Sequence, residues 1–337
     1  RRTYPARHRF QRGQAMMMML VGLFGLATAL LVYAMTDTTS LALRRDRDTA
    51  ATMAEVKRAL IGWSVQRTPS GSLPNARPGE FPCPDMNNDG LEDGTCVAGA
   101  IGRVPWKSLG IPEPKDAAGE TLWYAIAGPF RIWNVNSDPI HSDTKGNLTV
   151  YRDSTASVIT TEAIAVLFAP GAALGTQNRD TAASAFCSTT GTTIARNLCA
   201  ANYLETAATV NNSSTNGPFI SALSSATFND KVMEITTADL MPILEQRVAR
   251  EVRTLLVQYK AATAALGYGG GAGVYPWSDC SDGYADYGEN RNRIPSINAS
   301  PVNWGSGGGA PLPRWLPKTR STGQKWDLAL YYTVGEK

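Results

Sequence analysis

QAMMMMLVGLFGLATALLVYAM, the stretch from Gln14 to Met35, decides how this chain is organised. It carries no formal charge, and a helix of about 22 apolar residues crosses a bilayer core of roughly 30 Å. Five arginines lie among the thirteen residues before it, whereas Asp37 is the only charged residue from Thr36 to Leu43. Since positive charge stays on the cytoplasmic side of a span, we expect an inner-membrane helix with a cytoplasmic N-terminus. The remainder would lie in the periplasm or outside the cell. A cleaved secretory signal is the alternative.

The helical pattern continues beyond the predicted span. Neither Pro nor Gly occurs between Leu26 and Leu60, and apolar residues recur at helical spacing up to Trp63. We therefore expect one helix from Gln14 to about Val65, with residues 36–66 as an amphipathic stalk. The apolar face of this stalk consists of Met53, Val56, Leu60 and Trp63.

A short basic leader ends at Gln11-Arg12-Gly13, before the apolar helix, its amphipathic continuation and a cysteine-bearing head. This order of parts resembles the type IV pilins and the pseudopilins of type II secretion. The resemblance implies that prepilin peptidase removes residues 1–13 by cutting between Gly13 and Gln14. Major pilins carry glutamate at the fifth mature position, which is Met18 here, so the chain resembles the minor subunits, notably the large K-type tip pseudopilin. The residues implied in helix assembly are Met18, Leu20, Phe24 and Leu30.

The fold implied by the resemblance is α+β, with a long membrane-spanning helix that continues into a stalk and carries a head of antiparallel sheet. The implied function is that of a non-enzymatic subunit at the tip or surface of a type IV pilus or type II secretion filament. Its partners would be other pilin or pseudopilin subunits, prepilin peptidase, the inner membrane, and secreted cargo or a surface glycan. The alternative is a membrane-tethered periplasmic module for calcium-dependent binding or adhesion that does not enter a filament.

Four blocks recur in the same order along the chain, first between Glu55 and Ala125 and again between Glu251 and Tyr332. They are a helix, an aromatic-Pro turn with Asp and Cys, a Pro-Trp segment and an aromatic strand. We therefore predict two pilin-like units in the head, residues 67–236 with a long insertion and residues 237–337. Trp at matching places in both units is more typical of a core than of a glycan-binding surface.

The second unit is expected to begin with a soluble helix that has Thr237 as its N-cap and ends at Gly267. Strands are predicted at Thr121–Ala127, Thr160–Phe168 and Trp326–Val334, where apolar and aromatic residues alternate or run together. The apolar stripe of the helix consists of Leu240, Ile243, Leu244, Val248, Val252, Leu255, Leu256 and Tyr259.

Disulfides are expected because all five cysteines lie beyond the predicted span, where an oxidising compartment preserves them. The sequence leaves their connectivity open. Two close pairs suggest themselves, Cys83–Cys96 and Cys187–Cys199, each closing a loop of about a dozen residues. Cys280 is then left over. The net charge of +3 comes largely from the leader, and no basic patch with interleaved aromatics supports nucleic-acid binding.

The strongest candidate site is the loop DMNNDGLED at residues 85–93. Its oxygen-bearing side chains are spaced like positions 1, 3, 5 and 9 of an EF-hand-type calcium loop, and Gly90 supplies the sharp turn at position 6. An EF-hand loop has a bidentate glutamate at position 12, where this chain has Cys96. Glu92 is the candidate to replace that glutamate as a ligand. We expect Ca²⁺ here, with a plain solvated turn as the alternative. The candidate ligands are Asp85, Asn87, Asp89, Leu91, Glu92 and Asp93.

Catalysis has little support in the sequence. The chain contains two histidines, His8 and His141, and neither Gly-x-Ser-x-Gly nor His-Glu-x-x-His occurs. We therefore predict a non-enzymatic protein without catalytic residues. An enzyme would need a cleft with a perturbed His141 or a pair of neighbouring carboxylates.

Overall fold

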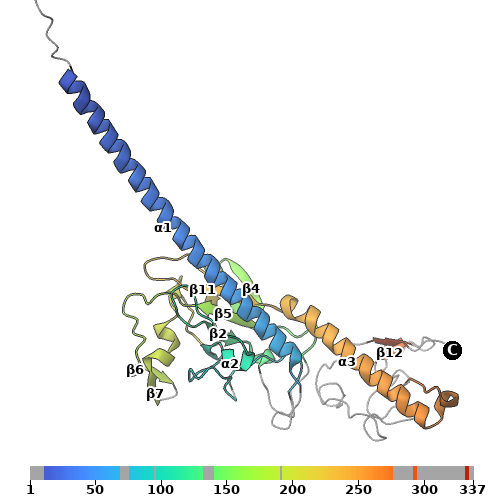
Figure 1. Cartoon of the computed structure of the whole chain (residues 1–337). Coiled ribbons are helices and arrows are strands. Elements are labelled where there is room, and N and C mark those ends of the chain that lie inside the picture. The colour runs from blue at the N-terminus through green and yellow to red at the C-terminus, as the bar shows by residue number, and fades with distance from the viewer. Residues whose placement is uncertain are drawn as a thin grey trace, which may run out of the picture. The chain divides into compact units, whose positions relative to one another are not determined.

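A single helix, α1 (Gln11–Gln66), forms the N-terminal part of the chain (Figure 1). The long run without Pro or Gly leaves nothing to interrupt its hydrogen-bond ladder, so the predicted continuous helix is confirmed. The chain forms two compact units, Arg1–Ala51 and Thr52–Lys337, and α1 begins in the first and ends in the second. The computed structural model describes residues 11–68, 76–94, 96–131, 140–189, 192–275, 291–293 and 331–333.

The predicted membrane span, Gln14–Met35, lies within α1. The side chains of residues 16–29 are described, and the rest of the predicted span lies outside the described side chains. Among the residues that the structure describes, no helix combines the length and the apolar character that crossing a membrane requires. The membrane assignment and the boundaries of leader, span and stalk stay predictions.

The last turns of α1, in the second unit, bury one apolar face. Met53, Val56 and Leu60 are all buried, and their spacing of three and four residues places them on the same side of the helix. They belong to the same core as the main sheet of the head. The predicted face of the stalk is therefore confirmed in this part of α1. Ile61 and Val65 complete the face, with Trp63 half-buried beside them.

The head is built around a four-stranded antiparallel sheet with the strand order β1-β2-β5-β11. Strand β5 (Ala165–Ala169) lies between β2 (Trp123–Ile126) and β11 (Lys231–Ile235), and β1 (Ile101–Arg103) forms one edge. Every side chain of β2 and β5 is buried, as their short, continuously apolar sequences predict. The strand expected at Thr121–Ala127 is therefore confirmed, and its Trp123 belongs to the core.

The single strand expected at Thr160–Phe168 is wrong, because this segment contributes to two strands in two sheets. Strand β4 (Val158–Ala163) pairs with β3 (Leu148–Tyr151), whereas β5 pairs with β2 and β11. The change of sheet occurs at Ile164, whose amide donates to the last carbonyl of β11 (2.8 Å). Composition explains the change, since β4 carries exposed Thr and Glu side chains and β5 is apolar throughout. The second sheet is completed by β10 (Phe219–Ile220), which runs parallel to β3.

The soluble helix expected in the second unit is α3 (Thr237–Ala265). Its N-cap is Thr236, and the expected cap Thr237 is instead the first helical residue. Asp239 decides this, because its Oδ2 accepts hydrogen bonds from the Thr236 amide (2.8 Å) and hydroxyl (2.9 Å) and closes a capping box. Gly267 follows the C-cap with a φ of +81°, so the predicted end of the helix is confirmed.

One side of α3 joins the core that α1 and the four-stranded sheet share. Ile243, expected on this side, is 47% exposed, and Met241 is buried in its place. The buried residues of α3 recur mostly every four residues from Leu240, and Ile243 lies at the margin of this face. The buried residues of α3 are Leu240, Met241, Leu244, Val248, Val252, Leu255, Tyr259 and Thr263.

Both expected disulfides are present. Cys83 and Cys96 are joined with their Cα atoms 5.7 Å apart, and Cys187 and Cys199 with theirs 5.5 Å apart. The fifth cysteine, Cys280, lies outside the described residues.

The repeat blocks after residue 275 also lie outside the described residues, apart from two short strands. One of these, β13 (Tyr331–Thr333), falls within the strand predicted at Trp326–Val334 and pairs with β12 (Arg291–Arg293). The internal repeat and the boundary at residue 237 stay predictions. The remaining elements are α2 (Trp106–Leu109), η1 (Gly128–Phe130), β6 (Ala183–Thr189), β7 (Thr192–Ala195), η2 (Arg196–Leu198), η3 (Ala200–Asn202), β8 (Thr206–Ala207), β9 (Val210–Asn211) and η4 (Tyr268–Gly271).

Candidate functional site

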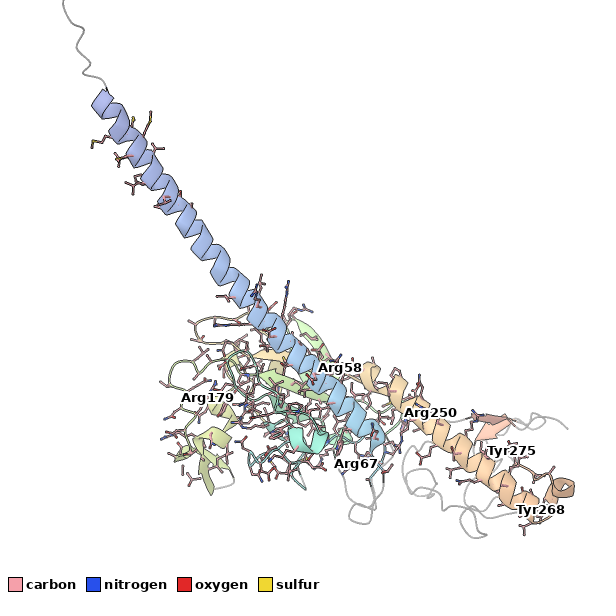
Figure 2. All side chains as sticks on the ribbon, viewed as in Figure 1. Arg58, Arg67, Arg179, Arg250, Tyr268 and Tyr275 are labelled. Atoms are coloured by element: carbon pink, nitrogen blue, oxygen red, sulfur yellow. A yellow bond between two sulfur atoms is a disulfide. The ribbon has the colours of Figure 1, made fainter. Side chains whose placement is uncertain are left out.

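The first candidate site is the N-terminal apolar surface, which we define as residues 16–29 of α1. The side chains of Met16–Met19 are between 67 and 75% exposed, and Figure 2 shows side chains projecting from several sides of this part of the helix. Successive helical residues are turned by about 100°, so four consecutive exposed methionines surround the helix. A helix that is apolar all round is typically buried in lipid or against other protein. In the part of the chain that the structure describes, this surface is therefore left exposed, and its composition suits an apolar environment.

Three of the four predicted assembly residues, Met18, Leu20 and Phe24, are exposed on this surface. The fourth, Leu30, lies outside the described side chains. The hydroxyl of Thr28 donates to the Phe24 carbonyl (2.9 Å), so this polar group is satisfied within the helix and tolerates an apolar environment. The predicted processing residues Gly13 and Gln14 lie in the first turn of α1, where the structure describes the backbone only.

The second candidate site is the acidic loop, residues 85–93, which is organised by the buried carboxylate of Asp85. Asp85 Oδ1 accepts a hydrogen bond from the Asn88 amide (2.6 Å), and Oδ2 accepts one from the Gly90 amide (2.7 Å). At the other end of the loop, Asp93 Oδ2 accepts a hydrogen bond from the Met86 amide (2.8 Å). Burial raises the pKa of Asp85, and the bonds from Gly90 and Asn88 oppose this shift. The loop therefore folds around its own acidic side chains.

The rest of the head holds this loop in place. The Asp85 backbone exchanges two hydrogen bonds with Arg103 of β1 (2.9 and 2.8 Å), and the Cys83–Cys96 disulfide brackets the loop. Gly90 has a φ of +84°, and a Cβ placed there would lie 2.8 Å from the Trp106 ring. Only glycine meets both conditions without strain. The ammonium of Lys107 donates to the Asp89 carbonyl, which brings a positive charge to the loop.

The predicted calcium ligands do not all meet in the acidic loop. Asn87 Nδ2 donates to Asp89 Oδ2 (3.1 Å), and Asp89 Oδ1 accepts a hydrogen bond from the Leu91 amide (2.7 Å). Glu92 instead faces Arg67, with 3.5 Å between Oε1 and Nη1. Among the described residues, no group of three or more His, Cys, Asp and Glu side chains is placed to hold a metal ion. The oxygens of Asp85, Asp89 and Asp93 suit Ca²⁺ by chemistry, so calcium binding stays a prediction.

The contact between Glu92 and Arg67 belongs to an ion cluster that sequence reasoning missed. Glu80 is fully buried, with its Oε1 3.0 Å from Arg77 Nε and its Oε2 3.9 Å from Arg67 Nε. Arg67 also lies over the ring of Trp63, 4.4 Å from its centroid, and Figure 2 labels this arginine near the end of α1. Burial raises the pKa of Glu80 and of Glu92, and the arginines oppose both shifts. The spacing of three residues between Arg77 and Glu80 is a local sign of the cluster in the sequence. Through Arg67, the ion cluster connects the acidic loop to the end of α1.

A second cluster missed by the sequence is a buried pair of carboxyl groups, Glu205 and Asp230. Each accepts a hydrogen bond from the backbone amide of the other, at 2.9 and 3.2 Å. The residues are far apart in sequence and carry no shared motif, so no local signal marks them.

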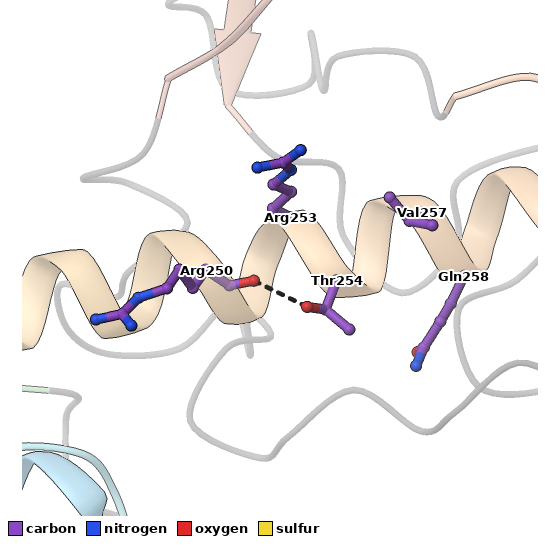
Figure 3. Close-up of a pocket in the computed structure, with 5 residues that line it drawn as sticks. All are labelled: Arg250, Arg253, Thr254, Val257 and Gln258. Carbon is purple, nitrogen blue, oxygen red and sulfur yellow. Dashed lines mark hydrogen bonds between the residues drawn. The ribbon is translucent and has the colours of Figure 1, made fainter.

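His141, the histidine that an enzyme would need, is buried in a turn. Its Nδ1 accepts a hydrogen bond from the Asp143 amide (3.2 Å), as a turn-capping side chain does. A hollow of about 420 Å³ lies elsewhere, on the exposed face of α3 (Figure 3). In that hollow the Thr254 hydroxyl donates to the Arg250 carbonyl (3.0 Å). The residues lining it are Arg250, Arg253, Thr254, Val257 and Gln258, none of which was predicted as a site residue.

The N-terminal apolar surface and the acidic loop are therefore the candidate sites with the strongest physical basis. Compared with models of protein families, with characterised proteins and with solved structures, the chain matches none. A functional assignment consequently rests on the residues of the chain itself.

Proposed function

We propose that this chain is a minor pilin or pseudopilin, a non-enzymatic subunit of a type IV pilus or type II secretion filament, placed at the tip or surface. The observation that carries the proposal is the contrast along α1. The N-terminal apolar surface exposes apolar side chains all round the helix, whereas Met53, Val56 and Leu60 of the same helix are buried in the core of the head. Such a helix joins a folded head to an apolar environment elsewhere.

The proposed mechanism is mechanical and driven by apolar burial. Before assembly, the N-terminal apolar surface lies in the inner membrane, and on assembly it packs against the helices of neighbouring subunits. Burying one Met, Leu or Phe side chain contributes roughly 1.5–3 kcal/mol, so this surface can hold the subunit in either environment. Met18 stands where major pilins carry a glutamate, which suits a first or tip subunit with no earlier N-terminus to pair with.

Prepilin processing tests the proposal most directly. We would measure the intact mass and the N-terminus of the chain extracted from inner membranes that contain prepilin peptidase. The expected mature chain begins at Gln14, and Gly13→Val is expected to block the cut. Gly22→Val is the matched control, since a Cβ at Gly22 meets no other atom and leaves the cut site unchanged. A wild-type chain that keeps residues 1–13 attached would contradict the proposal.

The second candidate function is a membrane-tethered periplasmic module for calcium-dependent binding of a surface glycan or of secreted cargo. The observation that favours it is the acidic loop, whose ends the Cys83–Cys96 disulfide brackets. A tether keeps its leader and makes no subunit contacts through α1. Cysteine cross-linking from Leu20 to pilin subunits in filament preparations therefore separates the two candidates, since only the filament subunit is expected to give cross-linked products.

A further inference from the structure

Glu205 and Asp230 form a buried carboxyl pair between the long insertion and the main sheet. Asp230 is 1% exposed and Glu205 is 8% exposed. The Glu205 amide donates to Asp230 Oδ2 (2.9 Å), and the Asp230 amide donates to Glu205 Oε2 (3.2 Å). These reciprocal bonds bring the two buried carboxyl groups together.

The two carboxyl groups have unequal sets of donors. Glu205 accepts two further hydrogen bonds, from the Asn229 amide (3.0 Å) and from Gln177 Nε2 (2.7 Å). Asp230 Oδ2 accepts one from Asn212 Nδ2 (2.9 Å), but Asp230 Oδ1 is buried with no donor. An ionised oxygen in that position would lose its hydration without replacement. A proton on Asp230 removes the problem, because the buried side chain then carries no charge.

The charged groups around the pair are engaged with other partners. Arg179 donates to the Gln177 side chain (2.9 Å) and pairs with Glu120 (2.9 Å), so its charge acts on the pair across Gln177. Lys231, next in sequence to Asp230, donates to the Ser224 hydroxyl (3.3 Å). Asp116 accepts a hydrogen bond from the Gly171 amide (2.7 Å). Burial, and then the charge of Glu205, raise the pKa of Asp230 well above its ordinary value.

We propose that Asp230 keeps its proton beside Glu205 at neutral pH, and that this proton stabilises the attachment of the β8–β9 hairpin to the start of strand β11. Glu205 directly precedes β8, and Asp230 directly precedes β11. Asn212, which follows β9, bonds both Asp230 and the Ile220 carbonyl of β10 (2.9 and 3.0 Å). Release of the proton to water at high pH leaves two buried negative charges in contact, and their repulsion loosens the hairpin.

The direction of this pH dependence follows from linkage. Because the pKa of Asp230 is raised in the folded state, its contribution to stability is fully present below the ordinary pKa of aspartate and is lost as pH rises through the folded value. The hairpin is therefore most firmly held in acid, and it loosens in alkali. In a protein displayed outside the cytoplasm, this pair makes part of the surface respond to the surrounding pH.

The test uses the full chain and the Asp230→Asn variant, which keeps the shape of the side chain and cannot ionise. The protection of the backbone amides at positions 205 and 230 against hydrogen exchange is measured from pH 5 to pH 9. The rates are corrected for the pH dependence of intrinsic amide exchange. In the wild type, protection is expected to fall by up to about tenfold per pH unit between the ordinary and the folded pKa of Asp230, because opening then releases one proton, and to level off above the folded value. In Asp230→Asn, it is expected to stay flat. Asp153→Asn, which removes an exposed carboxylate, is the control and should follow the wild type.

Glu205→Gln repeats the test from the other side of the pair, and it serves if Asp230→Asn does not fold. It should also remove the dependence on pH. Equal slopes in the wild type and both variants would overturn the proposal. A second overturning result is a rise in protection when Ca²⁺ or Mg²⁺ is added to the wild type but not to Asp230→Asn, because the pair would then hold a metal ion in place of the proton.

Discussion

Arg67 at the end of α1 lies 3.5 Å from Glu92 of the acidic loop, measured from Nη1 to Oε1. The same arginine lies 3.9 Å from the fully buried Glu80, so one guanidinium lies close to two carboxylates from separate segments. The residue expected to complete a calcium site is thus occupied in attaching that loop to the helix. Loop, helix end and buried carboxylate form one electrostatic unit.

Arg67→Gln should destabilise the head by about 1–3 kcal/mol, because Glu80 and Glu92 lose a buried counter-charge while Arg77 still pairs with Glu80. The loss should shrink as pH falls, since both glutamates already have raised pKa values and protonation removes the uncompensated charge. Urea unfolding at pH 7 and pH 4.5 measures both effects. Arg58→Gln, an exposed substitution on the same helix, should change stability by less than about 0.5 kcal/mol.

Phe24→Asp should release the chain from membranes and filaments without unfolding the head. A charge at the centre of a span costs about 2.5–3.5 kcal/mol, which is roughly two orders of magnitude in partitioning. Phe24 is 71% exposed, so the melting temperature of the head should stay unchanged. Membrane flotation and filament co-purification measure the loss. Val21→Leu on the same surface is the control, and a Phe24→Asp chain that still floats with membranes would contradict the proposed role of the surface.

Calcium should raise the melting temperature of the head if the acidic loop binds it. A ligand at one hundred times its Kd adds about 2.7 kcal/mol to stability. Asp89→Asn should abolish the gain, whereas Asp143→Asn, at a carboxylate whose side chain is 82% exposed, should leave it intact. Thermal unfolding in Ca²⁺ and in chelator is the measurement. If the wild type gains nothing, the amide hydrogen bonds accepted by Asp85, Asp89 and Asp93 organise a plain turn.

Gly90→Ala should destabilise the head more than Gly119→Ala does. Both glycines have a positive φ, +84° and +89°, but a Cβ meets the Trp106 ring at 2.8 Å only at Gly90 and meets nothing within 4 Å at Gly119. Backbone strain alone should cost about 1 kcal/mol at either position. The clash should add about 1–3 kcal/mol at Gly90. Equal losses in denaturant unfolding would mean that Trp106 moves aside without cost.

Local patterns predicted α1, α3 and the two disulfides well. The face of Met53, Val56 and Leu60 follows from helical spacing alone, and Cys83–Cys96 follows from short sequence separation. Helix ends were less accurate, because Asp239 shifts the cap of α3 to Thr236. Apart from β12 and β13, the segments that bear on the predicted repeat after residue 275 lie outside the described residues.

What the sequence determined by itself is therefore the set of interactions between near neighbours: the length of α1, the apolar character of residues 16–29, most of the buried face of α3 and the two short disulfide loops. The tertiary structure decided how distant segments share the core. It divides the chain between two sheets at Ile164, and it brings Glu205 to Asp230 across 25 residues of sequence. The physical reason is that helical periodicity and short loop closure act within a few residues, whereas burial and charge pairing depend on neighbours that only the folded chain supplies.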